Sequence, residues 1–141
     1  MKQLETIVDE ITSLLKETEY RKNRFSWYKV KDSLTVVLSI QKSQYDSDTW
    51  YYYFGICLHE IAGSNSKTIS NCQIRYRVNN AADGVLLSAE SIVHLLNRWD
   101  SMYGDLTQLR IHAIQGNLPI QSTVQAIQYL SSGDLSRFAK S

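Results

Sequence analysis

The strongest constraint on the fold is a run of twelve residues, Trp50 to Ile61, in which apolar side chains recur at every second position. The odd positions of the run carry tyrosines, a glycine, a cysteine and a histidine instead. Such alternation with a high aromatic content predicts one long strand in the middle of an antiparallel sheet. The apolar row of this strand is Trp50, Tyr52, Phe54, Ile56 and Leu58.

The segments before this strand have matching patterns. Residues 25–31 and 34–43 flank Asp-Ser, a short turn, and therefore predict a hairpin. Pairing Trp27 with Leu38 and Leu38 with Phe54 places the apolar rows of three strands on one face of the sheet. The basic residues 20–24 before the hairpin read as a connector.

A fourth strand is predicted over residues 72–78, where apolar and polar side chains alternate again. It follows a loop of glycine, serine and asparagine over residues 62–71. That loop is too long to fix the register of the fourth strand, which the sequence leaves open.

Helical spacing replaces alternation at both ends of the sheet segment. Apolar residues recur at intervals of three and four over residues 3–17, which predicts an amphipathic helix. A helical region is expected over residues 86–138, with Ser88 as a first cap, a break at Gly104 and Asp105 as a second cap. A shorter helix over residues 121–130 and a terminal turn over 135–138 would end the chain.

These elements predict a single α+β domain over residues 1–141. Its sheet would be a four-stranded antiparallel meander over residues 25–79, with the N-terminal helix and the helical region packed on one face, that of Trp27, Leu38 and Phe54. A chain of 141 residues buries about 70% of its unfolded surface and does not need disulfides or metal ions to be stable.

Charge and hydropathy set expectations for partners and location. The net charge is +1 and the pI about 7.8, so no global field attracts nucleic acid or a membrane. Neither is expected as a partner, although tyrosines on one strand can stack bases. The N-terminus lacks an apolar signal core and no apolar run reaches the length of a membrane span, so a cytoplasmic location is expected.

The sequence contains no motif for a cofactor or a catalytic nucleophile. It has no GxSxG, no glycine-rich phosphate loop and no CxxC. Glu90 and His94 have the spacing of metal ligands on a helix, but no third ligand accompanies them. Cys57 and Cys72 are expected to be buried free thiols in a reducing cytosol. No metal or cofactor is therefore expected, and the sequence favours a protein that is not an enzyme.

The second face of the predicted sheet gathers arginines and tyrosines. These residue types are enriched where proteins bind, and a guanidinium group suits a carboxylate or a phosphate. The alternative is a solvated face, or one covered by a helix whose Glu90 or Asp105 pairs with the arginines. Alternation alone does not choose between these. The candidate binding residues are Tyr28, Gln41, Tyr51, Tyr53, Arg75 and Arg77.

Four fragments on these strands also resemble a known family. They are Phe25-x-Trp27, the segment 41–43, the segment 53–56 and the segment 72–77, in this order. Together they resemble a bacterial family of cytosolic domains, the domain of unknown function 4304 family, over about residues 4–100. The resemblance implies an α+β domain of this size with no established enzymatic role.

The predicted function is non-catalytic recognition of a protein partner with an acidic surface. Small bacterial α+β domains of this kind include immunity proteins that neutralise toxins, so the analogy suggests that role. The alternative is a small-ligand-binding domain or an enzyme that uses the same polar face as the floor of a pocket. The oligomeric state is left open.

Overall fold

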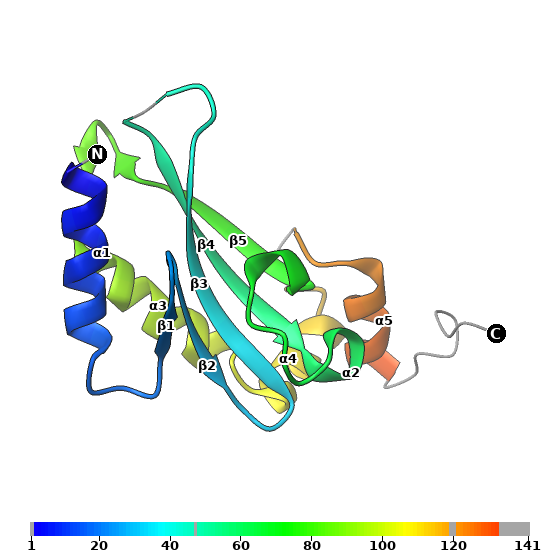
Figure 1. Ribbon diagram of the computed structural model, residues 1–141. Helices are drawn as coiled ribbons and strands as arrows, with labels where there is room; N and C mark the ends of the chain where they lie inside the picture. Colours follow the sequence, from blue (N-terminus) through cyan, green and yellow to red (C-terminus); the bar gives the residue numbers. More distant parts are fainter. Residues whose placement is uncertain (1, 47, 119–120, 133–141) are drawn as a thin grey trace.

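A computed structural model describes residues 2–46, 48–118 and 121–132 (Figure 1). Its centre is an antiparallel sheet of order β1-β2-β3-β4-β5, so each strand pairs with its neighbours in sequence. Helices cover one face of this sheet, which confirms the predicted α+β class. The strands are β1 (Arg21–Asn23), β2 (Ser26–Val30), β3 (Leu34–Lys42), β4 (Trp50–Leu58) and β5 (Ile74–Asn79).

The remaining elements follow the chain around the sheet. A short separate hairpin lies between the sheet and the helical region. The helices are α1 (Lys2–Leu15), α2 (His59–Ala62), α3 (Ala89–Tyr103), α4 (Leu106–Ile114) and α5 (Val124–Ser132), with a 3-10 turn η1 (Ile69–Asn71) and the hairpin strands β6 (Ala81–Ala82) and β7 (Val85–Leu86).

The predicted register of the first strands is confirmed. Trp27 pairs with Leu38, and Leu38 pairs with Phe54. The open register of the last strand is resolved by the pairing of Phe54 with Tyr76. One face of the sheet therefore carries a continuous apolar row, on which α1 and α3 pack (Figure 1). Trp27 and Phe54 are each 1% exposed within this core.

Two helix starts have the predicted caps. The Ser88 hydroxyl accepts a hydrogen bond from the Ser91 amide at 3.1 Å, and α3 begins at Ala89, directly after Ser88. The Asp105 carboxylate accepts one from the Thr107 amide at 2.7 Å at the start of α4. These bonds satisfy backbone donors that the first turn leaves unpaired.

The sheet has five strands where the sequence predicted four. The additional strand, β1, lies in the basic segment 20–24, which read as a connector. All three residues of β1 are exposed, so this strand is held by its pairing with β2 and not by burial. Apolar alternation could not reveal it. Strand β5 begins at Ile74 and not at Cys72, and the predicted terminal turn over 135–138 lies outside the described residues.

The second face of the sheet is partly covered by the loop that contains η1. A small apolar cluster forms there from Val37, Cys57, Ile69 and Cys72. Gly55 permits this close approach, because a β-carbon at that position would collide with Ile69 and Cys72.

The prediction of free thiols was wrong, because Cys57 and Cys72 form a disulfide. Both are buried, as predicted. The pairing of Ile56 with Ile74 places the residues before β5 beside the end of β4, where the two cysteine Cα atoms lie 4.0 Å apart. The unresolved register of the fourth strand had hidden this proximity.

Candidate binding groove

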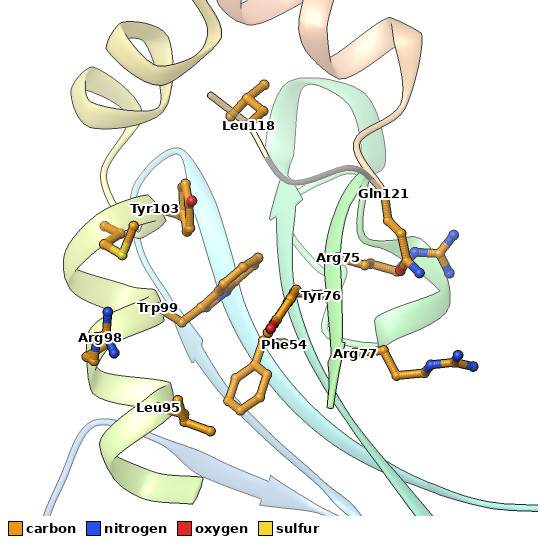
Figure 2. Close-up of a pocket in the computed structure, with 11 residues that line it drawn as sticks. Phe54, Arg75, Tyr76, Arg77, Leu95, Arg98, Trp99, Tyr103, Leu118 and Gln121 are labelled. Carbon is orange, nitrogen blue, oxygen red and sulfur yellow. The ribbon is translucent and has the colours of Figure 1, made fainter. Parts of the chain in front are cut away.

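A groove with a volume of about 660 Å³ opens between α3 and the outer edge of β5 (Figure 2). Strand β5 brings its side chains to this groove because it is the last strand of the sheet. Helix α3 supplies the opposite wall. The lining residues are Phe54, Arg75, Tyr76, Arg77, Leu95, Arg98, Trp99, Met102, Tyr103, Leu118 and Gln121.

Aromatic rings form the floor of the groove around Trp99. The Trp99 ring centroid lies 4.8 Å from that of Tyr103 and 6.3 Å from that of Tyr76, to which it is nearly parallel. Its indole N–H donates to the Gly55 carbonyl oxygen at 3.2 Å, which fixes the ring. Trp99 is only 6% exposed, whereas Tyr76 is 52% exposed. The floor is therefore preformed, and the ring of Tyr76 is its solvent-exposed part.

Three arginines flank this floor. Arg75 and Arg77 leave β5 on the side opposite to Tyr76, and Arg98 projects from α3 (Figure 2). No acidic side chain is among the described residues that line the groove. The lining therefore carries the positive charge of three guanidinium groups.

The two arginines of β5 differ in their surroundings. Arg77 is exposed, and its guanidinium carbon lies 4.6 Å from the ring centroid of Tyr51. Arg75 is half-buried, and its Nε has no hydrogen-bond partner in the described part of the chain. A buried donor without a partner is unfavourable unless a bound group satisfies it.

The six residues predicted as a binding surface fall into separate groups. Arg75 and Arg77 line the groove. Tyr51 lies beneath Arg77, outside the lining. Tyr28 and Tyr53 are half-buried against the disulfide cluster, and Gln41 is exposed without lining the groove. Among the described residues, the second face is thus partly open and partly covered by the loop that contains η1.

The helical wall was missed by sequence reasoning. Trp99 and Tyr103 are four residues apart on one side of α3, and this spacing was the signal in the sequence that they act together. Arg98 and Gln121 gave no signal, because a single polar residue on a helix or in a loop has no pattern.

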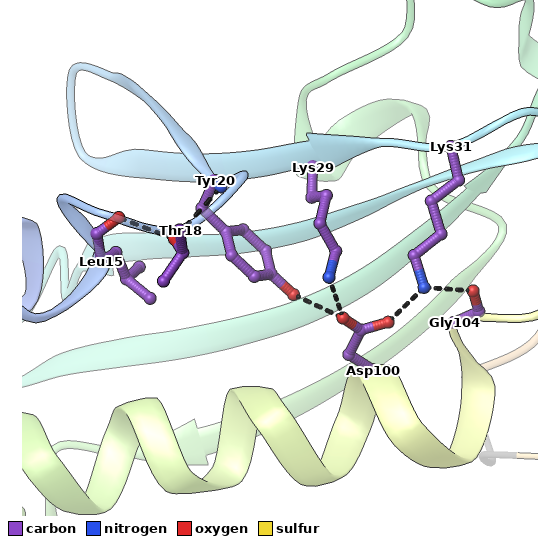
Figure 3. Close-up of polar contacts among 7 residues, drawn as sticks. All are labelled: Leu15, Thr18, Tyr20, Lys29, Lys31, Asp100 and Gly104. Atoms are coloured by element: carbon purple, nitrogen blue, oxygen red, sulfur yellow. Dashed lines mark hydrogen bonds and ion pairs between the residues drawn. The ribbon is translucent and has the colours of Figure 1, made fainter.

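The arginines do not pair with Glu90 or Asp105 in the described part of the chain. The ion pairs there join Asp100 of α3 to Lys29 and Lys31, each at 2.5 Å (Figure 3). Lys31 also donates to the carbonyl oxygen of Gly104 at 2.6 Å. These bonds fasten β2 to the last turns of α3, and so they position the helical wall of the groove.

Burial and charge shift two pKa values in this cluster. Burial alone raises the pKa of Asp100, but the hydrogen bonds and charges of Lys29 and Lys31 outweigh it and hold that pKa below its usual range. Burial raises the pKa of the Tyr20 phenol, and the charge of Asp100 adds to the effect. The Tyr20 hydroxyl donates to Asp100 at 3.3 Å. The cluster is therefore a fully paired structural link.

The described residues contain no group of three or more histidine, cysteine or acidic side chains placed to hold a metal ion. His59 lies 2.8 Å from the Thr35 hydroxyl through its Nε2, a partner that the sequence did not reveal. In the same part of the chain, no helix is both long and apolar enough to cross a membrane.

Comparison with protein families identifies the chain. A family model described as Domain of unknown function (DUF4304) matches residues 11–118. The chain belongs to the DUF4304 family. The match contains the whole sheet, α3 and α4, and every residue that lines the groove except Gln121. Neither a curated protein nor a solved structure matches the chain.

The groove of this DUF4304 domain has the chemistry of a binding site. The polar side chains among the described residues that line it are those of arginine, tyrosine and glutamine. Such a lining provides hydrogen-bond donors and aromatic surface. It can hold an anionic group next to an apolar or aromatic one.

Proposed function

We propose that this DUF4304 domain is a non-catalytic recognition module that binds an acidic protein partner in the groove between α3 and β5. The observation that carries the proposal is that Arg75, Arg77 and Arg98 line one groove with an aromatic floor, with no described carboxylate in the lining. Arginine, tyrosine and tryptophan dominate the binding energy of protein interfaces, and guanidinium groups pair with carboxylates.

The arginines are available to a partner. Among the described residues none of the three is in an ion pair. The exposed Arg77 is already oriented by the ring of Tyr51, which reduces the entropy that binding would cost. The floor is fixed by the bond from Trp99 to Gly55, so it needs no reorganisation either.

An immunity role, in which the acidic partner is a toxin, is a narrower form of the same function. It rests on the analogy with other small bacterial domains and stays a prediction. The cytoplasmic location also stays a prediction. Disulfides persist mainly in oxidising compartments, so the disulfide of Cys57 and Cys72 does not favour the predicted cytoplasmic location. The proposed binding in the groove does not depend on the location.

A small anionic ligand is the second candidate, because one feature favours it. The groove volume of about 660 Å³ lies within the range of small-molecule sites, about 300–1,000 Å³. Such a ligand would use the same arginines. Binding of pyrophosphate or of an aromatic carboxylate in preference to an acidic chain would support this candidate over a protein partner.

Charge removal on the groove tests the proposal. The probe is fluorescein-labelled polyglutamate, measured by fluorescence anisotropy at low and moderate salt. The variant Arg77→Gln with Arg98→Gln removes two exposed charges from the groove, and we expect its affinity to fall about tenfold or more. Arg75→Gln is measured separately, because the Nε of Arg75 is buried.

The matched control removes two exposed charges from the opposite edge of the sheet, by Arg21→Gln with Arg24→Gln. Its affinity should stay within about threefold of the wild type, because screened charges far from the site contribute little. An equal loss in both variants would show general attraction of a polyanion and would overturn the groove as the site. A urea titration should show less than about 1 kcal/mol of lost stability in either variant.

A further inference from the structure

The backbone of β5 leaves one row of hydrogen-bonding groups facing outward. The Asn80 amide donates to the Trp50 carbonyl oxygen at 3.0 Å, so even-numbered positions along this strand point toward β4. In an antiparallel pair the intervening positions point away. The N–H and C=O groups of Arg75, Arg77 and Asn79 therefore lie on the outer edge of the sheet.

The chain itself uses this edge at one place. The Thr123 amide donates to the Gln73 carbonyl oxygen at 2.9 Å, at the odd position just before β5. This bond agrees with the outward direction of the odd-numbered positions. Among the described residues, no other loop bonds to the backbone of Arg75, Arg77 or Asn79.

Side chains on the two sides of this edge have different chemistry. Arg75 and Arg77 project to the second face of the sheet, whereas Tyr76 projects to the aromatic floor beside Trp99 (Figure 2). A segment that paired with β5 would alternate in the same way. Its residues opposite the arginines would face positive charge, and the residues between them would face the floor of the groove.

We propose that the acidic partner contributes an extended segment that pairs antiparallel with β5 from Arg75 to Asn79. In this segment acidic residues alternate with apolar ones. The carboxylates lie against Arg75 and Arg77, and the apolar side chains enter the groove over Tyr76 and Trp99. The proposal rests on the proposed function and specifies its partner. Every pair in the sheet is antiparallel, and antiparallel bonds are slightly stronger per residue.

The positive charge of Arg75 and Arg77 favours an acidic segment on this edge over the β5 strand of a second copy of the chain. Antiparallel pairing of two β5 strands would place arginines of one copy beside arginines of the other, and like charges on adjacent strands are destabilising. Arginines on an edge strand can also serve only to discourage aggregation. That role would need no partner, and the experiment below separates it from binding.

A short peptide of alternating glutamate and valine, capped at both ends, is the probe. In an antiparallel pair the residues opposite Arg75 and Arg77 turn their N–H groups toward β5, and these are the glutamates. N-methylation of the glutamate amides should therefore reduce the affinity about tenfold or more, because several hydrogen bonds are lost. N-methylation of the valine amides should change it by less than about threefold, because those amides face solvent.

Amide hydrogen exchange locates the contact on the domain. The peptide should slow the exchange of the Arg77 and Asn79 amides, which face outward. The Tyr76 amide already bonds to β4 and should change little. Equal protection of all three amides would indicate general stabilisation and not strand addition.

The outcomes separate the two proposals. Binding that tolerates both kinds of N-methylation would overturn strand addition and leave recognition by the arginines standing. Loss of binding only with methylated valines would overturn the antiparallel orientation. Absence of binding by both the peptide and polyglutamate would overturn the proposed function itself. A dimer in sedimentation that the peptide cannot dissociate would show a second copy on this edge and would overturn the proposed occupant.

Discussion

The Nζ of Lys31 lies 2.5 Å from Oδ1 of Asp100, and this ion pair ties the end of β2 to α3 across 69 residues of sequence. Asp100 is the neighbour of Trp99, which forms the floor of the groove. The position of that floor thus depends on a salt link on the other side of the helix. Lys29 reinforces the link through the second carboxylate oxygen.

Asp100→Asn should lower the free energy of unfolding by about 1–3 kcal/mol. Removing one partner of a fully buried ion pair costs about 3–5 kcal/mol, but the Lys31 side chain is 33% exposed and its charge is partly hydrated. Urea unfolding measures the change, with the exposed Asp9→Asn of α1 as the matched control. A loss no greater than in the control would show that the link does not hold α3.

The same carboxylate makes stability depend on pH. Its pKa is held below the usual range in the folded state, so its stabilising effect is complete above the unfolded pKa of about 4. The effect is lost as the pH falls through the lowered folded value. The stability difference between the wild type and Asp100→Asn should therefore shrink in this acidic range and stay constant from about pH 5 to 8. A difference independent of pH down to about pH 2 would contradict the assignment.

Trp27→Ala should cost about 3–5 kcal/mol of stability, as large aromatic truncations in cores do. Trp27 is 1% exposed, and its indole N–H donates to the Thr12 hydroxyl of α1 at 3.3 Å. Trp27→Phe keeps most of the buried surface and should cost less. Chemical denaturation compares the variants, and an unchanged midpoint for Trp27→Ala would place this side chain outside the core.

Reduction of the disulfide should lower stability by about 3 kcal/mol, because Cys57 and Cys72 are separated by 15 positions in the chain. Alkylation of the denatured protein without a reductant should add no mass, and alkylation after reduction should modify both cysteines. Urea titrations with and without reductant measure the stability. Full alkylation without a reductant would restore the free thiols predicted from the sequence.

Alternation of side chains was enough to predict most of the sheet. The row on the buried face is apolar from Leu34 to Ile40 in β3 and throughout β4, so a shift of one residue would expose it, and the pairing of Leu38 with Phe54 could be deduced. The helix caps at Ser88 and Asp105 were equally local and were confirmed. In these places the signal lies within a few residues of the feature.

The remaining features depend on contacts between distant segments. Strand β1 is exposed and gains its structure only from β2. The disulfide required the register of β5, which a long loop separates from β4. The groove requires Trp99 beside Tyr76, and no pattern within either segment shows that they meet. Of the candidate site, only Arg75 and Arg77 were predictable, because alternation placed them together on one strand.

The sequential order of the strands has a consequence for the path of folding. Each strand pairs with its immediate neighbour in the chain, so the sheet can assemble through a series of short loop closures. The packing of α1 against α3 instead brings together two segments of the chain, one before the first strand and one after the last strand of the sheet. That step has the largest loop-closure entropy. We therefore expect the meander to nucleate first and the groove, which needs α3 in place, to be among the last features to form.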